Sequence, residues 1–281
     1  MRSRMYKTTD ACDVSHAQLC AIMGDAFSDY AVPMQPTLQQ FQFMMTQRSF
    51  APDLSTLLWQ DDALVGLWLI GRRAFDGYLI TSGIIPAHRG EGRARDMAEQ
   101  SNDALRAAGC RRITTEVIEE NMKARRLYER LGYDRLRDLD CFSLPEVTAE
   151  PVDGLSIKEV PWRLCADRTD GWRDWPPSWQ NADRAIQDAE ADAVVFGAYR
   201  DETLCGYAAG FRPATALAQI AVAPDQRRRG IGRALMAALA AELGTPLRVL
   251  NAEATDPGFR GFVFDLGAEP TIGQFELGLT L

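Results

Sequence analysis

The chain has 281 residues, of which 46% are hydrophobic and 25% charged, and a formal net charge of −8. This composition is ordinary for a globular protein, and the length fits two domains of normal size. The acidic balance argues against a general binder of nucleic acid or anionic membranes. The two histidines leave little material for a histidine-based metal site or a Ser-His-Asp triad.

Targeting and redox signals are also weak. The N-terminus lacks the apolar core of a signal peptide, and the longest apolar run, Ala63–Gly71, is too short to span a bilayer. The six cysteines show no C-x-x-C spacing, so free thiols in a reducing compartment are expected. We therefore expect a cytoplasmic monomer or homodimer without a metal, a membrane or a nucleic-acid partner.

In chain order, apolar periodicity and turn residues predict alternating helices and strands over a first domain, residues 1–146. The expected helices are Ser15–Phe27, Thr37–Gln47, a helix running to Ala108, and Asn121–Arg130. The expected strands are Met5–Lys7, Leu54–Gln60, Ala63–Arg73, Tyr78–Ile85, Arg112–Val117 and Arg135–Leu144. A linker is expected within Pro145–Gly154, which is rich in proline and acidic residues.

The second domain is expected over residues 152–281 with a similar order of elements. Its expected strands are Leu155–Val160, Ala193–Arg200, Thr203–Arg212, Ala216–Ala223, Pro246–Asn251 and Gln274–Leu281. Its expected helices are Asn181–Ala189, Ala234–Leu243 and Asp256–Asp265. The segment Trp162–Trp179 is rich in tryptophan, and we interpret it as interface core between the domains rather than as a lid.

One pattern occurs twice: a buried strand, a basic loop with glycines, and a helix. The first copy is Ile84–Ala94 and the second is Ile220–Gly232. A helix N-terminus presents free N–H groups, and glycines let a ligand approach the backbone, so both loops suit a phosphate. Leu64-Val65-Gly66 and Leu131-Gly132 also have counterparts about 140 residues further on, which indicates a tandem repeat.

These residues resemble the GNAT superfamily of acyl-coenzyme A N-acyltransferases. Arg89-x-x-Gly92-x-Ala94 is similar to its pyrophosphate loop, and Asn121-x-x-Ala124-x-x-Leu127-Tyr128 with Leu131-Gly132-Tyr133 is similar to its second signature. Arg227-x-x-Gly230-x-Gly232 matches the loop again. The resemblance implies two tandem GNAT-like domains, each with a mixed, splayed central β-sheet flanked by helices.

It also implies an N-acetyltransferase that uses acetyl-coenzyme A as co-substrate without a metal. The amine of a small molecule or peptide would attack the thioester directly, and Tyr128 would protonate the leaving thiolate. Glu116 is a candidate base acting through water, although a solvated surface carboxylate is the preferred interpretation. Asp29 and Tyr30 are candidate acceptor contacts. The implied coenzyme contacts are Ile84, Ile85, Arg89, Gly90, Glu91, Gly92, Arg93, Ala94, Asn121, Ile220, Val222, Arg227, Arg228, Gly230, Ile231 and Gly232.

The second half departs from the family pattern. Counting back from Leu266-Gly267 places Val263 where Tyr128 stands and Pro257 where Asn121 stands. The N-terminal half is therefore the expected catalytic half, although Glu91 is an unfavourable charge in its loop. A P-loop lacks its Gly-Lys-Ser/Thr, a dinucleotide site lacks G-x-G-x-x-G, and a non-catalytic acyl-coenzyme A sensor or scaffold stays open.

Overall fold

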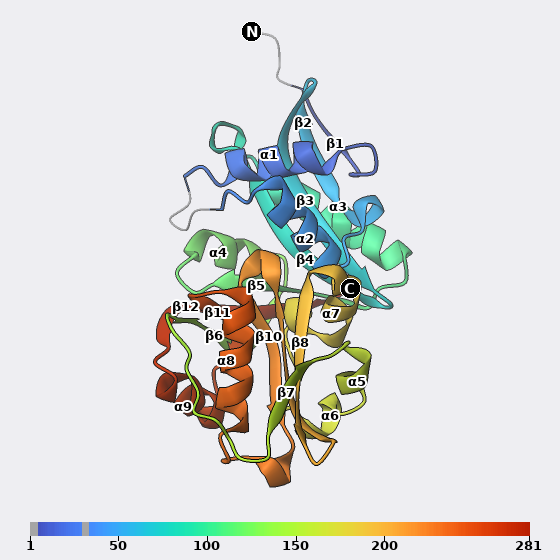
Figure 1. Cartoon of the computed structure of the whole chain (residues 1–281). Coiled ribbons are helices and arrows are strands. Elements are labelled where there is room, and N and C mark those ends of the chain that lie inside the picture. The colour runs from blue at the N-terminus through green and yellow to red at the C-terminus, as the bar shows by residue number, and fades with distance from the viewer. Residues whose placement is uncertain (1–4, 30–33) are drawn as a thin grey trace. The chain divides into compact units, whose positions relative to one another are not determined.

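A computed structural model of the chain describes residues 5–29 and 34–281. The chain forms two compact α/β units (Figure 1). Unit 1 extends to Leu136 and also includes Glu276–Leu281, whereas unit 2 is Arg137–Phe275. The expected fold class is confirmed, because each unit contains a mixed sheet and helices in the same order.

Unit 1 contains the elements expected from the first half of the sequence. Its strands are β1 (Tyr6–Thr9), β2 (Thr56–Gln60), β3 (Ala63–Arg73), β4 (Asp76–Ile84) and β5 (Arg112–Ile118). Its helices are α1 (His16–Ala26), α2 (Leu38–Gln47), α3 (Arg93–Ala107) and α4 (Met122–Arg130). Ser15 and Thr37 begin α1 and α2 with capping boxes, each completed by a glutamine three residues later. The expected cap at Ser15 is confirmed.

Unit 2 repeats this order with shorter helices before its second strand. Its strands are β7 (Ser156–Glu159), β8 (Ala193–Arg200), β9 (Thr203–Phe211), β10 (Ala216–Val222) and β11 (Leu247–Glu253). Its helices are α5 (Arg163–Ala166), α6 (Thr169–Trp172), α7 (Asp183–Asp188), α8 (Ile231–Leu243) and α9 (Pro257–Asp265). Leu235, Met236 and Leu239 of α8 are fully buried in the core of this unit.

The two remaining strands each pass from one unit into the other. β6 (Asp134–Leu144) begins in unit 1, and in unit 2 it pairs antiparallel with β11, with Leu144 opposite Leu247. β12 (Glu269–Thr280) begins in unit 2 and continues into unit 1, where it is the neighbour of β5. β6, the last strand of the first half, therefore joins the strands β7 to β11 of unit 2. β12, the last strand of the second half, joins the strands β1 to β5 of unit 1.

This exchange changes the expected domain boundary. The sequence places a single cut within Pro145–Gly154, but the compact units divide within β6 and again within β12. The final strand also begins at Glu269, five residues before the expected start at Gln274, because no turn interrupts the chain there. Local sequence signals mark turns between elements, and they carry no information about which sheet a strand joins.

The tryptophan segment lies inside unit 2. Trp162 and Trp172 pack against Tyr207 of β9, and Trp175 packs edge-on against Phe259 of α9 at 5.0 Å between ring centroids. These three tryptophans therefore contribute to the core of unit 2, and the expected interface role of the segment stays a prediction. The rings bury large apolar areas on the sheet of unit 2 itself.

Candidate active site

A cleft opens in unit 1 where β4 and β5 separate. The two strands pair in parallel only from Asp76 to Tyr78 on β4, although β4 continues to Ile84. Beyond that point lies a cavity of about 580 Å³. Its lining residues include Phe27, Trp68, Ser82, Gly83, Ile84, Arg89, Gly90, Gly92, Arg93, Ala94, Asn121, Lys123, Ala124, Leu127, Tyr128 and Arg130. The splayed sheet thus leaves backbone groups of β4 facing an open space.

The first glycine loop forms one end of this cavity. Gly92 caps α3 in the left-handed conformation, with φ +80°, and Gly90 has φ +97°. No heavy atom lies within 4 Å of the position that a Cβ would take at either glycine. The space in front of these two glycines, at the N-terminus of α3, is therefore open, and a helix N-terminus favours an anion.

Glu91 does not disturb this loop. Its side chain is 80% exposed and forms an ion pair with Arg93, and it is absent from the cavity lining among the described residues. A carboxylate in this position repels a bound phosphate only weakly, because solvent and the Arg93 guanidinium screen its charge.

The guanidinium group of Arg89 forms hydrogen bonds within unit 1. Its guanidinium donates to both carboxylate oxygens of Asp29, at 2.6 and 2.7 Å, and to the carbonyl oxygens of Ile84 and Ala26, both at 2.9 Å. The hydrogen bonds from Arg89 are the main cause of the lowered pKa of the Asp29 carboxyl group. Arg89 and Asp29 therefore hold the end of α1 against the end of β4, a role that the sequence did not reveal. Tyr30 lies outside the described residues.

Tyr128 and Asn121 both lie on the cavity wall. Tyr128 is 6% exposed, its ring packs edge-on against Trp68, and its hydroxyl lies 3.4 Å from the Ser82 hydroxyl. Asn121 caps α4, because its side-chain oxygen accepts from the Ala124 N–H at 3.1 Å. Both residues therefore line the cavity, and the cap and the cavity position of Asn121 are compatible.

Two other expected site residues face elsewhere. Glu116 of β5 accepts a hydrogen bond from the Tyr78 hydroxyl, and burial together with the Glu116 charge raises the pKa of Tyr78. Among the described residues, Glu116 is not part of the cavity lining. Ile85 donates its N–H to Val65 of β3 at 2.9 Å, so its backbone is paired within the sheet, whereas Ile84 lines the cavity.

Unit 2 repeats the loop geometry closely. Gly230 caps α8 with φ 80°, like Gly92. Arg227 donates to the carbonyl oxygens of Val222 and Trp172 and to the carboxylate of Asp174 at 2.8 Å, which reproduces the contacts of Arg89. Asp174 is therefore the counterpart of Asp29. The sequence does not reveal this correspondence, because the segment that separates the aspartate from its arginine differs in length between the two halves.

The loop of unit 2 is covered, however. A Cβ at Gly232 would lie 3.3 Å from the Phe262 ring, and one at Gly230 would lie 3.1 Å from Val152. Ile231 is 1% exposed and belongs to the core. Val152 thus occupies the space that stays open in front of Gly92, the counterpart of Gly230, whereas Gly232 corresponds to Ala94.

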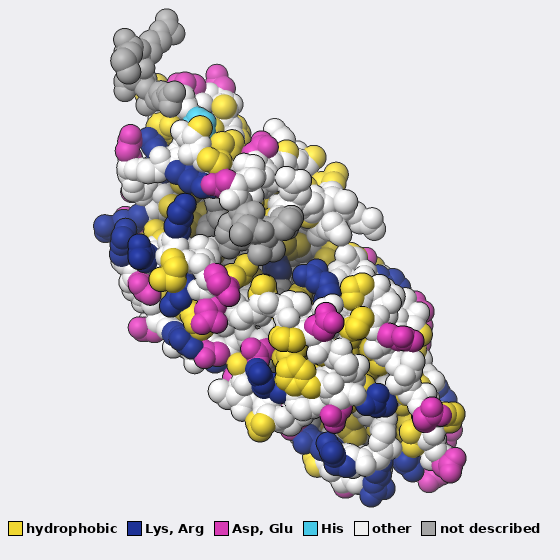
Figure 2. Space-filling model, turned by 90° about the vertical axis from the view of Figure 1, so that its left-hand side faces the viewer, with side chains coloured by type: hydrophobic (Ala, Val, Ile, Leu, Met, Phe, Trp, Pro, Cys, Tyr) yellow, Lys and Arg dark blue, Asp and Glu magenta, His cyan; other side chains and the backbone are white. Residues whose placement is uncertain are grey.

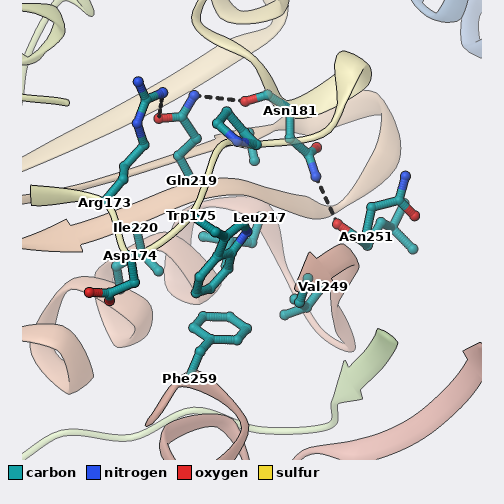
Figure 3. Close-up of a pocket in the computed structure, with 14 residues that line it drawn as sticks. Arg173, Asp174, Trp175, Asn181, Leu217, Gln219, Ile220, Val249, Asn251 and Phe259 are labelled. Atoms are coloured by element: carbon teal, nitrogen blue, oxygen red, sulfur yellow. Dashed lines mark hydrogen bonds between the residues drawn. The ribbon is translucent and has the colours of Figure 1, made fainter. Parts of the chain in front are cut away.

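The cleft of unit 2 is also filled. β10 and β11 pair in parallel only at Ala216 and Leu217, so this sheet splays as in unit 1. The remaining cavity has a volume of about 60 Å³, and the rings of Trp175 and Phe259 meet within it (Figure 3). Gln219 of β10 is held there by Asn181 and Asp183, to which its amide donates at 2.7 and 2.8 Å. Ile220 lines what is left.

Helices α4 and α9 correspond, with one correction to the sequence alignment. The Tyr128 carbonyl accepts from the N–H of Tyr133, and the Val263 carbonyl accepts from the N–H of Ala268, both at 3.0 Å. Val263 is therefore the counterpart of Tyr128, as expected. The counterpart of Asn121 is Asp256, which caps α9, and not Pro257.

Several lining residues were missed by sequence reasoning. Trp68 and Ser82 come from neighbouring strands, and only the sheet register brings them to Tyr128. For Lys123 and Arg130 the sequence offers a weak indication of a place in the cavity lining, because helical spacing puts both on the same stripe of α4 as Leu127. The face drawn in Figure 2 shows basic side chains interspersed with acidic ones, so charge alone does not mark the cavity.

The described residues hold neither a metal-binding cluster nor a membrane-spanning helix. They contain no group of three or more histidine, cysteine, aspartate or glutamate side chains that could hold a metal ion. None of the helices described is long and apolar enough to cross a membrane. The six cysteines are free, and Cys110, Cys141, Cys165 and Cys205 are buried.

Comparisons with known proteins agree with this geometry. The sequence pattern of the acetyltransferase (GNAT) family matches residues 18–133 and 164–257. A mycothiol acetyltransferase of Beutenbergia cavernae is 31% identical over 135 residues, which cover 47% of this chain and 44% of that protein. The N-alpha-acetyltransferase MAK3 of Arabidopsis thaliana is 34% identical over 68 residues, covering 24% of this chain and 36% of that protein. The chain thus spans less than half the length of these relatives.

Solved structures share the whole fold. A tandem GNAT protein from the clavulanic acid biosynthesis pathway has a TM-score of 0.74 at 16% identity, covering 99% of this chain and 98% of that one. A GCN5-related N-acetyltransferase from Sphaerobacter thermophilus has a TM-score of 0.73 at 14% identity, covering 98% and 95%. At these identities the likeness concerns the fold.

Proposed function

Because the chain belongs to the acetyltransferase (GNAT) family, whose members transfer acyl groups from acyl-coenzyme A, we propose that it is an N-acetyltransferase acting on a primary amine. The observation that carries this proposal is the open cleft of unit 1, where a free glycine loop and the Tyr128 hydroxyl line one cavity. The pyrophosphate would lie on the first turn of α3 and the pantetheine arm between β4 and β5.

The proposed chemistry is a direct transfer. The amine nitrogen attacks the thioester carbonyl, the carbon–sulfur bond breaks, and the Tyr128 hydroxyl gives its proton to the thiolate. The amine proton passes to solvent, which reprotonates the phenolate. No covalent enzyme intermediate is required, because holding the two substrates together supplies much of the acceleration. Trp68 and Ser82 orient the phenol from the opposite wall.

We propose that unit 2 supports the fold without binding coenzyme A. Phe262 and Val152 cover its glycine loop, Trp175 and Phe259 fill its cleft, and Val263 replaces the phenol of Tyr128. Its Arg227–Asp174 pair survives without an open site beside it. This pair therefore argues that the matching arginine of unit 1, Arg89, serves the fold as well.

The acceptor is proposed to be a small-molecule or peptide amine in the cytoplasm. The names of the two relatives above support these classes, one being a mycothiol acetyltransferase and the other an N-alpha-acetyltransferase. The test is a screen of amines with acetyl-coenzyme A, following release of free thiol. Amine-dependent thiol release supports an enzyme. Binding of acetyl-coenzyme A without turnover of any amine favours the second candidate, a non-catalytic acyl-coenzyme A sensor or scaffold.

A further inference from the structure

The side chain of Arg93 is bonded to the glycine loop that precedes it. Arg93 is the first residue of α3, and its side chain is only 12% exposed. Its guanidinium group donates to the carbonyl oxygens of His88 and Gly90, at 3.1 and 3.3 Å, and forms an ion pair with Glu91. These bonds connect the start of the helix to the start of the loop. Much of the hydrogen-bonding capacity of Arg93 is therefore used within the protein.

Tyr6 of β1 contacts both ends of the same loop. The Cζ atom of Arg93 lies 3.9 Å from the centroid of the Tyr6 ring, which is a close cation–π contact. The Tyr6 hydroxyl lies 3.3 Å from Nδ1 of His88, and the two rings meet edge-on. Gly90 and Gly92, both with positive φ, lie between His88 and Arg93. One side chain from a distant strand therefore holds the segment that contains both glycines.

The internal repeat has a different pair of residues at this place. Arg93 and Ile231 correspond, because each is the first residue of the helix after the loop, and Ile231 is 1% exposed. Tyr6 corresponds to Leu155, because Tyr6 lies opposite the last residue of β2 and the register of β7 places Leu155 opposite the last residue of β8. Leu155 packs against the hydrophobic cluster that contains Ile231. The covered loop is thus held by apolar burial, and the open loop by a cation on an aromatic ring.

Resting on the proposed function, we propose that Tyr6 is a positioning residue for the coenzyme. Through Arg93 and His88 it holds the glycine loop in the conformation that receives the pyrophosphate. An apolar pair stabilises a loop only where water is excluded, whereas a guanidinium group on a ring is also effective at a solvated site. Tyr6 acts from outside the cavity, whose described lining does not include it. A loop that is already ordered binds its ligand more tightly, because less conformational freedom is lost on binding.

The test measures amide hydrogen exchange in the free protein and the affinity for coenzyme A by calorimetry. In Tyr6→Leu we expect exchange of residues 89–95 to rise and the affinity to fall about tenfold, because the loop is released. Tyr6→Phe keeps the ring on Arg93 and should hold the affinity within about threefold of that of the unaltered protein. Thr8→Leu is the matched control, because Thr8 is exposed on the same strand and is not part of the described cavity lining. It should change neither quantity.

A double-mutant cycle tests whether Tyr6 acts through Arg93. The variant Tyr6→Leu/Arg93→Ile introduces the residues of unit 2, and adding Tyr6→Leu to Arg93→Ile should cost no more than about threefold in affinity. Fully additive losses would overturn the inference, as would unchanged exchange and affinity in Tyr6→Leu.

Two further results would also overturn it. A loss in Tyr6→Phe as large as that in Tyr6→Leu would remove the role of the ring. A loss in Thr8→Leu of the same size would assign the effect to the stability of β1. Absence of any binding of coenzyme A to the unaltered protein would instead contradict the proposed function, and the exchange of residues 89–95 would still test the contact between Tyr6 and the loop.

Discussion

Arg89 and Asp29 form a two-pronged ion pair, with oxygen–nitrogen distances of 2.6 and 2.7 Å, that joins the end of α1 to the first glycine loop. Arg227 and Asp174 form the same connection in unit 2. Since one of these loops is open and the other covered, the pair is a feature of the repeated fold. Its function is to fix the loop from which the first turn of the following helix begins.

This pair predicts an acid-dependent contribution to stability. Arg89 lowers the pKa of Asp29 below its ordinary value of 3.8 in the folded state. A depressed carboxyl pKa adds stability above the unfolded-state value, and this contribution is lost as the pH falls through the folded-state value. Asp29→Asn should therefore lower the Tm near neutral pH, and its difference from the unaltered protein should shrink as the pH is lowered below about 4.

Thermal unfolding followed by circular dichroism between pH 3 and pH 7 measures this difference. Asp25→Asn is a suitable control, because Asp25 lies on α1, four residues before Asp29, and forms no ion pair among the described residues. A Tm difference for Asp29→Asn that stays constant or grows toward acid would contradict the assignment of the pair.

Removing the phenol of Tyr128 should reduce rate more than affinity. General acid catalysis contributes about 10²–10⁴-fold, so Tyr128→Phe should lower kcat by that range while leaving the Kd for acetyl-coenzyme A nearly unchanged. The ring and its contact with Trp68 are retained in this variant. Tyr133→Phe is the control, since Tyr133 is buried beside Tyr128 and is not part of the described cavity lining. Full activity of Tyr128→Phe would require another acid.

The two loops should respond differently to the same substitution. Gly92→Glu and Gly230→Glu both place a side chain at φ 80°, which costs about 1–2 kcal/mol in either unit. Only Gly92→Glu adds a negative charge to an open loop, so it should abolish binding of acetyl-coenzyme A. Gly230→Glu should retain binding, with a lower Tm because its Cβ meets Val152 at 3.1 Å. The reverse pattern would move the site to unit 2.

Calorimetry of the unaltered protein should then give one coenzyme A per chain. The aromatic side chains of unit 2 exclude a second molecule, because a cavity of about 60 Å³ is far smaller than the 580 Å³ available in unit 1. A stoichiometry of two would show that Trp175 and Phe262 move aside on binding. Gly92→Glu serves as the control, since it should remove all the binding.

Sequence patterns predicted the local structure well and the wider arrangement less well. β3 occupies the predicted Ala63–Arg73 because a continuous apolar run begins after the turn at Asp61-Asp62 and ends at Arg72-Arg73. The glycine loop was predicted from its strand, loop and helix pattern, and Asn121 and Tyr128 from their resemblance to the second signature of the GNAT superfamily. The Arg89–Asp29 pair, Trp68 beside Tyr128, and the filling of the second cleft depend on packing between distant segments. No local pattern encodes them.

The exchange of β6 and β12 predicts that the halves are not independent. A fragment ending at Glu150 retains β6 but lacks Glu276–Leu281, the part of β12 that belongs to unit 1 and lies next to β5. It loses the buried Leu277 side chain, worth about 1.5–3 kcal/mol, and exposes the hydrogen-bonding edge of β5. We therefore expect residues 1–150 alone to be unfolded or aggregated, and co-expression with residues 151–281 to restore a folded complex.

Circular dichroism and size-exclusion chromatography of the separate and combined fragments measure this. A shorter truncation provides the finer test: removing Gly278–Leu281 from the full chain should lower the Tm and raise amide hydrogen exchange in β5, while exchange in β8 and β9 changes little. β8 and β9 serve as the reference, because they lie in unit 2 and are not neighbours of β12 in the sheet order. A stable, monomeric fragment of residues 1–150 with a cooperative unfolding transition would show that β12 is dispensable to unit 1, and the domain boundary would then return to the linker.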